Sequence, residues 1–240
     1  SEDLDKKKVT TFNSFNVYLR QNNNMLNIAF ESSQFSDDEL YAILKAYKKK
    51  KKFAFLKGKV IELDEKTTTE LANIVEDFNL DERNLSKEVN NPLFNLLKVS
   101  NYYSLSSFEI EDKLGSILSD LKDYKEADFK VNDELARIMR PYQIEAFKWL
   151  KTLNKYNLGG VLADDMGLGK TLETIALLDS VESSFPSIII SPKSLIYNWE
   201  KELNKWPTSL KPCVVIGNKD ERKHILKRNF KKNVVFIISY

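Results

Sequence analysis

A lysine and a threonine directly follow a glycine-rich turn in the second half of the 240-residue chain. Gly167 and Gly169 in this turn let the backbone come close to a bound group, so that successive N–H groups face it. Lys170 can reach the β- and γ-phosphates of a nucleotide, and the Thr171 hydroxyl can ligate Mg²⁺. These residue types in this order predict binding of a nucleoside triphosphate together with magnesium.

A phosphate-binding loop needs a strand before it and a helix after it, and the sequence predicts both. The apolar run at residues 159–163 predicts a short buried strand. Apolar residues at helical spacing over 170–181 predict an amphipathic helix whose positive N-terminal end would face the phosphates. The order G-x-x-x-x-G-K-[ST] is kept except at its first glycine, where Asp164 stands. The flanking elements argue against a chance Gly-Lys-Thr.

Composition excludes several classes of protein. Apolar residues make up 42% of the chain and charged residues 30%, as in a globular protein of one or two domains. The single cysteine, Cys213, excludes a disulfide framework and is expected to be a buried thiol; the single histidine, His224, is expected on an exposed helix surface. No apolar run approaches the length of a membrane span and the charged N-terminus is unlike a signal peptide, so we expect a soluble, cytoplasmic protein.

The net charge of +2 is unevenly distributed along the chain. Residues 1–139 contain 21 basic and 25 acidic residues, whereas residues 140–240 contain 16 basic and 10 acidic ones. The basic excess therefore lies in the half that carries the glycine-rich turn, as expected if that half also meets a polyanion.

Residues 1–130 predict a mixed α and β region without a catalytic constellation. The first ten residues lack periodicity and are expected to be irregular. Alternating patterns predict two hairpins, and apolar spacing predicts four helices, the first opened by a capping box of Ser36 and Glu39. The predicted hairpins cover 15–20 with 25–30 and 53–56 with 59–63; the helices begin after Ser36 and cover 67–78, 85–99 and 108–124, with a turn at 101–103.

Two segments of this region imitate functional sites. The lysine run 48–52 could contact DNA phosphates, but lysines also suit a solvated helix C-terminus, which is the favoured interpretation. Residues 60–65, Val-Ile-Glu-Leu-Asp-Glu, imitate a magnesium-binding Walker B strand. They precede the glycine-rich turn, whereas that strand follows the turn in this class of fold, so we interpret them as structural.

From about residue 131 helices alternate with short apolar strands, which predicts a parallel sheet covered by helices on both faces. The predicted helices cover 142–153, 170–181, 194–205 and 219–229, and the predicted strands cover 160–163, 188–190, 213–216 and 234–238. The chain stops at Tyr240, directly after a predicted strand, and we expect the domain to continue beyond it.

Three segments resemble the Q motif, motif I and motif Ia of the Swi/Snf family, the helicase-like ATPases of superfamily two. They are MRPYQIEAFKWL at 139–150, ADDMGLGKT at 163–171 and IISPKSLIYNWEKEL at 189–203. Residues 233–240 are similar to motif Ib of the family, and residues 1–130 resemble the helicase-associated domain of its bacterial members. Family members commonly carry Asp-Glu-Met-Gly-Leu-Gly-Lys-Thr, which explains Asp164, and Asp165 resembles the bacterial variant.

The resemblance implies an α/β fold in which a mixed α+β accessory domain, 1–130, precedes part of a RecA-like lobe, 131–240, with a P-loop parallel sheet. It implies ATP and Mg²⁺ as ligands, with Lys170 and Thr171 as catalytic residues. Gln143 would bind the adenine edge, favouring ATP over GTP, and Arg140 would help to build the same pocket. The other implied nucleotide-binding residues are Asp164, Asp165, Met166, Gly167, Leu168 and Gly169.

The resemblance also implies a function. Pro192, Lys193 and Ser194 would lie near the backbone of one DNA strand, whereas Trp199 is expected to pack in the core. The expected parent protein is a monomeric ATP-driven translocase on double-stranded DNA, with a DNA-bound protein as a further candidate partner. The family's Asp-Glu motif and its second lobe with arginine fingers are not found in these residues. We therefore expect this chain alone to bind ATP weakly and to hydrolyse it negligibly.

Two alternatives remain open at this stage. A small P-loop kinase would need acceptor-binding and lid segments after the loop, where the chain has Pro-Lys-Ser-Leu-Ile-Tyr-Asn-Trp instead. A non-catalytic protein could bind a partner through its N-terminal module and keep the loop only for its structure. Intact Gly169, Lys170 and Thr171 argue against the second alternative.

Overall fold

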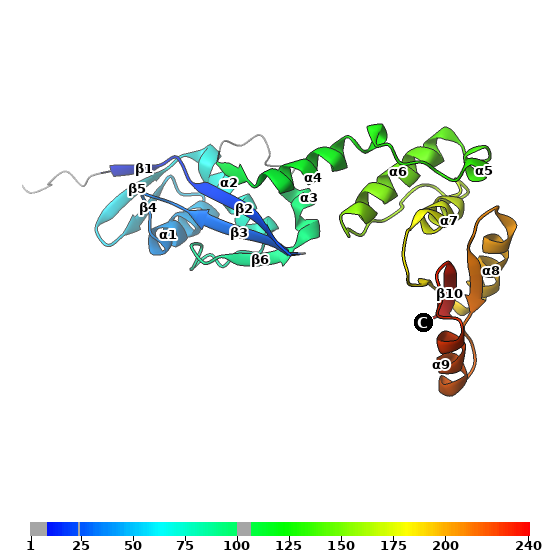
Figure 1. Ribbon diagram of the computed structural model, residues 1–240. Helices are drawn as coiled ribbons and strands as arrows, with labels where there is room; N and C mark the ends of the chain where they lie inside the picture. Colours follow the sequence, from blue (N-terminus) through cyan, green and yellow to red (C-terminus); the bar gives the residue numbers. More distant parts are fainter. Residues whose placement is uncertain (1–8, 24, 100–106) are drawn as a thin grey trace, which may run out of the picture. The chain divides into compact units, whose positions relative to one another are not determined.

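The computed structural model describes residues 9–23, 25–99 and 107–240. The chain divides into two compact units, Ser1–Ser119 and Asp120–Tyr240, which run from blue to green and from green to red in Figure 1. Each unit has its own sheet structure, and each is described separately.

A three-stranded sheet in the first unit separates a buried face from an open one. Its strands are β1 (Val9–Phe12), β4 (Phe53–Leu56) and β5 (Lys59–Leu63). Their order is β1-β5-β4, with β1 parallel and β4 antiparallel to β5. Phe12, Ala54 and Ile61 are buried, and helix α1 (Asp37–Lys48) packs on β4 and β5 with α2 (Glu65–Asp77) beside it. Strand alternation turns Phe53 and Phe55 to the other face, where both are exposed.

The second sheet of this unit has the order β6-β3-β2-β7. Strand β3 is antiparallel to β2 and to β6, whereas β7 is parallel to β2. The strands are β2 (Asn16–Asn22), β3 (Met25–Glu31), β6 (Val89–Pro92) and β7 (Phe108–Ile110). Three further helical segments are η1 (Leu93–Asn95), α3 (Leu96–Val99) and α4 (Asp112–Lys122).

Both hairpins predicted in this unit are confirmed, as is the helix over 67–78, which begins at Glu65. The predicted capping contact is present, because the Glu39 carboxylate accepts a hydrogen bond from the Ser36 backbone N–H over 3.0 Å. The prediction of an irregular first ten residues is wrong at Val9 and Thr10, which pair with Val60 and Ile61.

Two helices of this unit begin later in the chain than predicted. The segment 85–99 contains β6 before its short helices, because residues 89–92 find hydrogen-bonding partners on β3. Residues 108–110 form β7 against β2, and the helix starts only at Asp112. The predicted turn at 101–103 lies outside the described residues.

The second unit is built on a parallel sheet, as predicted, and the strand order is β8-β10-β9. Its strands are β8 (Ser187–Ser191), β9 (Lys211–Val214) and β10 (Val234–Ser239). Its longer helices are α6 (Pro141–Lys155), α7 (Lys170–Ser180), α8 (Ile196–Lys205) and α9 (Lys219–Arg228). Three short segments complete it: η2 (Tyr124–Glu126), α5 (Asp133–Ala136) and η3 (Lys193–Leu195).

Helices cover both faces of this sheet, though not completely. On one face Ile189, Val235 and Ile237 pack with Ile175 of α7 and with Ile196 and Leu203 of α8. On the other face Val234 and Phe236 pack with Val215 and with Ile225 and Leu226 of α9. That cover does not extend over β8, where Ile188 and Ile190 are 57% and 65% exposed.

The predicted strand at 159–163 is wrong. No strand of the described residues pairs with it, and Val161 is 81% exposed. The segment lies against α6 instead: a Cβ added to Gly160 would be 2.5 Å from Leu153 Cδ1 and 2.7 Å from Trp149 Cη2. An apolar run becomes a strand only where a neighbouring strand completes its hydrogen bonds, and here none does.

Three smaller expectations for this unit have mixed outcomes. The strand predicted at 213–216 covers Lys211–Val214 instead, and Cys213 is half-buried rather than buried. His224 is exposed on α9, as predicted. In the part of the chain that the structure describes, no helix is both long and apolar enough to cross a membrane.

Candidate nucleotide-binding site

The glycine-rich turn has a backbone conformation that glycine adopts readily and other residues rarely adopt. Gly167 and Gly169 have φ angles of 88° and 96°, in the left-handed region. Helix α7 begins directly afterwards at Lys170, so its N-terminal N–H groups and its positive end lie at the turn. Residues 164–168 are exposed, with Met166 at 94%. The backbone of the turn is thus open to a ligand.

The Lys170 ammonium lies over the loop. Its Nζ donates hydrogen bonds to the carbonyl oxygens of Asp164, over 2.6 Å, and Asp165, over 2.8 Å. Thr171 is half-buried in the first turn of α7. A cation surrounded by loop oxygens and backbone N–H groups at a helix N-terminus fits a phosphate group, and the adjacent hydroxyl fits Mg²⁺ as a ligand.

Helix α6 is hydrogen-bonded to the same loop. The Gln143 side chain is buried; its Oε1 accepts from the Arg140 N–H over 2.9 Å, and its Nε2 donates to the Leu168 carbonyl over 2.7 Å. The Tyr142 hydroxyl donates to the same carbonyl oxygen over 2.8 Å. Gly169 is required by this contact as well as by its φ angle, since a Cβ there would be 2.2 Å from Gln143 Nε2.

The structure therefore brings Gln143 and residues 164–171 together. Both ends of the Gln143 amide bind protein groups in this arrangement, and Arg140 is exposed as the residue that precedes α6. The adenine-binding roles assigned to Gln143 and Arg140 stay predictions. What the structure adds is a direct connection between Gln143 and the turn that would hold the phosphates.

Sequence reasoning missed Glu173, one turn into α7. Its side chain is fully buried, and neither carboxylate oxygen has a hydrogen-bond partner among the described residues. Burial, and then the negative charge of Asp164, raise the pKa of this carboxyl, while Lys170 opposes the shift. The helical spacing indicated that Glu173 is buried, because it precedes the buried Ala176 by three residues and so lies on the same side of the helix.

The predicted DNA-contacting residues follow the carboxyl end of β8. Pro192, Lys193 and Ser194 are all exposed, and a hydrogen bond from the Leu195 N–H to the Pro192 carbonyl, over 2.9 Å, forms the turn that leads into α8. Their role in DNA binding stays a prediction. Trp199 is half-buried and packs against the cluster around Ile196 and Leu203, which confirms it as a core-packing residue.

Residues 60–65, which resemble a Walker B strand, have a structural role, as their position before the glycine-rich turn predicted. Asp64 precedes α2 and accepts hydrogen bonds from the Thr67 backbone N–H and hydroxyl, each over 2.8 Å. These hydrogen bonds lower the pKa of the Asp64 carboxyl. The carboxylate is a helix cap in the first unit, whereas the glycine-rich turn lies in the second.

A parallel α/β sheet and a glycine turn that opens a helix are features found in phosphate-loop proteins. Residues 142–240 match the SNF2-related domain, and residues 1–132 match the bacterial SNF2 helicase-associated domain. The chain belongs to the SNF2 family, which confirms the resemblance to Swi/Snf ATPases.

Curated relatives carry descriptions of the same kind. The ISWI chromatin-remodeling complex ATPase ISW1 of Saccharomyces cerevisiae is 38% identical over 109 residues, which are 44% of this chain and 9% of that protein. The uncharacterized ATP-dependent helicase MG018 of Mycoplasma genitalium is 41% identical over 106 residues, 42% of this chain and 10% of that protein. This chain thus spans only about a tenth of the length of these relatives.

The solved structure is the SWI2/SNF2 ATPase core of Sulfolobus solfataricus in complex with double-stranded DNA. It is 34% identical with a TM-score of 0.38, over 48% of this chain and 23% of that one.

Proposed function

We propose that this chain provides the ATP-binding part of an ATP-driven motor that translocates on double-stranded DNA. The observation that carries the proposal is the convergence of α6 and α7 on one glycine turn. Gln143 reaches the Leu168 carbonyl from α6, and Lys170 covers the loop from α7. Membership of the SNF2 family supports the assignment of this turn to ATP.

The proposed roles follow from the positions of the groups. Loop N–H groups between Gly167 and Lys170 would hold the phosphates, and Lys170 would exchange its two carbonyl partners for phosphate oxygens. Thr171 would ligate Mg²⁺, which neutralises charge on the phosphates when it is bound. Arg140 and Gln143 would contact the adenine, so that ATP is preferred over GTP.

The DNA-binding part of the proposal rests on Pro192, Lys193 and Ser194, whose exposed turn would contact one strand's backbone. A relative has been solved in complex with double-stranded DNA, which supports the choice of partner. We assign residues 1–130 to the accessory domain and 131–240 to the front of the first RecA-like lobe. The proposed molecule is monomeric and cytoplasmic, with a DNA-bound protein as a further partner.

We further propose that these 240 residues bind ATP weakly and hydrolyse it negligibly. Hydrolysis needs a group that positions water and cations that stabilise the transferring charge, in addition to a phosphate loop. Neither kind of group is identified among these 240 residues. Robust DNA-stimulated turnover by the chain alone would contradict this part of the proposal.

A titration with a fluorescent ATP analogue in the presence of magnesium tests nucleotide binding. We expect saturable binding that ATP displaces and GTP does not, and loss of binding in Lys170→Ala. Lys201→Ala is the matched control, because Lys201 is an exposed lysine of α8 in the same unit. Equal binding by Lys170→Ala and the parent chain would contradict the proposed role of the loop.

The same titration separates the proposal from a non-catalytic alternative. In that alternative Gln143 and Lys170 only stabilise the fold through the hydrogen bonds seen here. This alternative predicts that the folded chain binds no nucleotide. It also predicts that Lys170→Ala lowers the stability of the chain and has no other effect. Binding that depends on Lys170 excludes it.

A further inference from the structure

The open face of the β1-β5-β4 sheet carries two exposed aromatic rings on its edge strand. Phe55 is 68% exposed and Phe53 is 39% exposed, although both lie in a regular strand whose intervening residue, Ala54, is buried. The hairpin turn at Lys57 and Gly58 has two left-handed residues, with φ of 48° and 83°, which is typical of a tight two-residue turn. Such a turn fixes the register of the hairpin, and therefore keeps both rings on the same face.

A row of apolar side chains crosses the sheet from β4 to β1. Phe55 lies opposite Val60, and Val60 lies opposite Val9, which is 54% exposed. We call the surface formed by Val9, Phe53, Phe55 and Val60 the open face. Exposed rings in a regular strand are costly in water, so a surface of this kind indicates a binding site.

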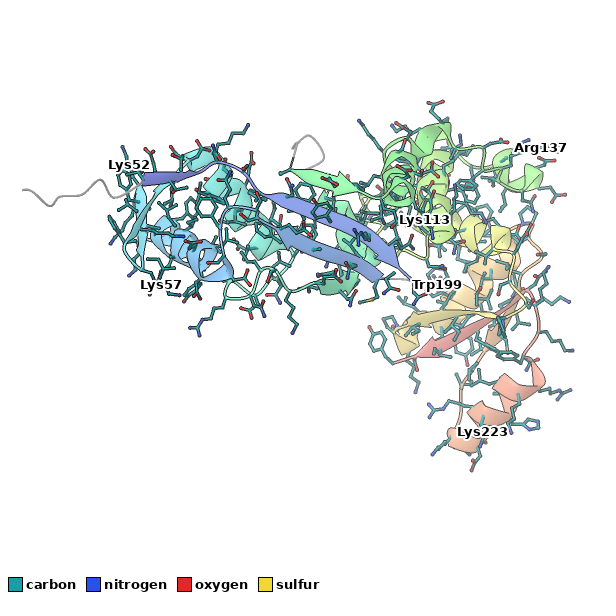
Figure 2. All side chains as sticks on the ribbon, turned by 60° about the vertical axis from the view of Figure 1, so that its left-hand side comes forward. Lys52, Lys57, Lys113, Arg137, Trp199 and Lys223 are labelled. Atoms are coloured by element: carbon teal, nitrogen blue, oxygen red, sulfur yellow. The ribbon has the colours of Figure 1, made fainter. Side chains whose placement is uncertain are left out.

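Lysines lie at both ends of the aromatic strand. Residues 45–61 contain eight lysines and no acidic residue. Lys52 directly precedes β4 and Lys57 directly follows it, and Figure 2 labels both at this hairpin. Each of the lysines 48, 57 and 59 forms an ion pair, with Glu82, Asp38 and Glu39 respectively. Lysines 49–52 are exposed and form no ion pair with the described residues.

Charge and aromaticity together define the chemistry of the partner. Uncompensated lysines attract phosphates, but a partner that offered phosphates alone would leave the two rings without a contact. In a duplex the bases are stacked on each other and their faces are not accessible to Phe53 or Phe55. Single-stranded nucleic acid offers both groups, because its unpaired bases stack on aromatic side chains while its backbone follows a basic groove. The two rings are about 6.6 Å apart along the strand, so successive bases can each contact one ring.

We propose that the open face binds single-stranded nucleic acid, with bases stacked on Phe53 and Phe55 and phosphates bound by Lys49–Lys52. The site lies in the first unit and the glycine-rich turn lies in the second. The proposal is therefore independent of nucleotide binding, and binding of the strand needs no ATP.

One acidic residue lies on the same face. Glu62 is opposite Phe53 and accepts a hydrogen bond from the Thr11 hydroxyl over 3.3 Å. Its negative charge opposes a nearby phosphate, so Glu62→Gln should tighten binding of the strand at low salt. The direction of this effect distinguishes a polyanion from an uncharged apolar partner, whose affinity would not depend on the charge at position 62.

The test measures fluorescence anisotropy of a labelled oligothymidylate of about 16 nucleotides with the full chain at low salt. Each of Phe53→Ala and Phe55→Ala should weaken binding about tenfold. Phe94→Ala is the matched control, because Phe94 is an exposed phenylalanine of the same unit, at 54%, outside this sheet. It should leave the affinity unchanged.

A salt titration tests the lysines separately. Lys51→Gln with Lys52→Gln should reduce the slope of log affinity against log salt by about 1.4, or 0.7 for each phosphate that a lysine no longer neutralises. The same replacement at Lys113, an exposed lysine of α4, is the control. Phe55→Trp keeps a stacking surface, so its affinity should be retained and its fluorescence quenched on binding.

Two results would overturn the proposal. One is an affinity that Phe53→Ala and Phe55→Ala leave unchanged while the lysine variants weaken it, which would show a phosphate-only contact. The other is displacement of the labelled strand by an equal amount of duplex of the same length. Absence of any binding at low salt by the folded chain would equally exclude the site and favour a protein partner.

Discussion

The side-chain amide of Gln143 donates a hydrogen bond to the carbonyl oxygen of Leu168 over 2.7 Å. The first turn of α6 is thereby attached to the glycine-rich turn in front of α7, and the Tyr142 hydroxyl strengthens the same attachment. A residue expected to recognise adenine thus also holds the loop expected to bind phosphate. Any change at Gln143 should affect the two parts of the proposed site together.

Gln143→Ala should lower the stability of the second unit and weaken nucleotide binding at the same time. The variant removes both hydrogen bonds of a buried amide and leaves the Arg140 N–H without its partner, so we expect a loss of about 1–3 kcal/mol. Denaturation monitored by tryptophan fluorescence measures this, because all three tryptophans lie between residues 149 and 206.

Tyr142→Phe is the matched control for Gln143→Ala. It removes one hydrogen bond of an exposed hydroxyl to the same carbonyl, and should cost less than about 1 kcal/mol. If the two variants destabilise the unit equally, Gln143 does not hold the loop.

Gly169→Ala should disrupt the loop through two separate effects. Alanine at a φ of 96° is strained, and its Cβ would be 2.2 Å from Gln143 Nε2. We expect a destabilisation of about 1–3 kcal/mol by fluorescence-monitored denaturation, and loss of nucleotide binding. At Gly159 an added Cβ meets no atom within 4 Å. Gly159→Ala should therefore leave stability unchanged or raise it by up to about 1 kcal/mol.

Glu173→Met should stabilise the second unit at neutral pH. The parent carboxyl is buried and has no hydrogen-bond partner among the residues that the structure describes, and its pKa in the folded state lies above the ordinary value of 4.5. The folded state therefore holds the proton up to a higher pH than the unfolded state, and stability falls as the pH rises from 4.5 through the folded pKa. Methionine removes the buried charge at similar volume.

The expected gain of Glu173→Met is about 1–3 kcal/mol at pH 7, and it should diminish toward pH 4. Denaturation of variant and parent at both pH values provides the comparison. A gain that does not change with pH would mean that the Glu173 carboxyl has the same pKa in the folded and unfolded states.

Thr171→Ala should remove the magnesium dependence of nucleotide binding. The hydroxyl follows the loop directly at the start of α7, so its loss should reduce affinity in magnesium to the level found in a chelator. Thr171→Ser keeps the hydroxyl and should retain the dependence. Titration of the ATP analogue with and without magnesium measures both variants, and an unchanged response in Thr171→Ala would exclude the assignment.

Local patterns in the sequence predicted most helices and both hairpins of this fold. The alternation of apolar and polar residues on either side of Lys57 and Gly58 involves only neighbouring residues, and so does the capping contact of Ser36 with Glu39. Such local features can be read from the sequence. The missed strands depend on partners far along the chain: β1 exists because β5 lies beside it, and β6 because β3 does. The segment 159–163 shows the converse, because its apolar pattern finds no strand to pair with.

Residue order predicted the turn in front of α7 and left its role as a prediction. Gly167, Gly169 and Lys170 predict a phosphate-binding turn, and the structure has a glycine turn that opens a helix at these positions. The hydrogen bond between Gln143 and Leu168 was not predictable, since it depends on how α6 approaches the turn. Glu173 was missed for a related reason: helical spacing gives its position, whereas its lack of a partner is a property of the packed interior.

Strand β8 should also affect how the protein behaves at high concentration. It is an edge strand among the described residues, and its sequence, Ser-Ile-Ile-Ile-Ser, has no charge, with Ile188 and Ile190 turned outward. An uncharged, β-branched edge is a template on which a second chain can add a strand. Only Pro186 and Pro192, at its two ends, limit how far such pairing could extend. Storage lifetime should therefore shorten as concentration rises, and a lysine at position 188 should lengthen it.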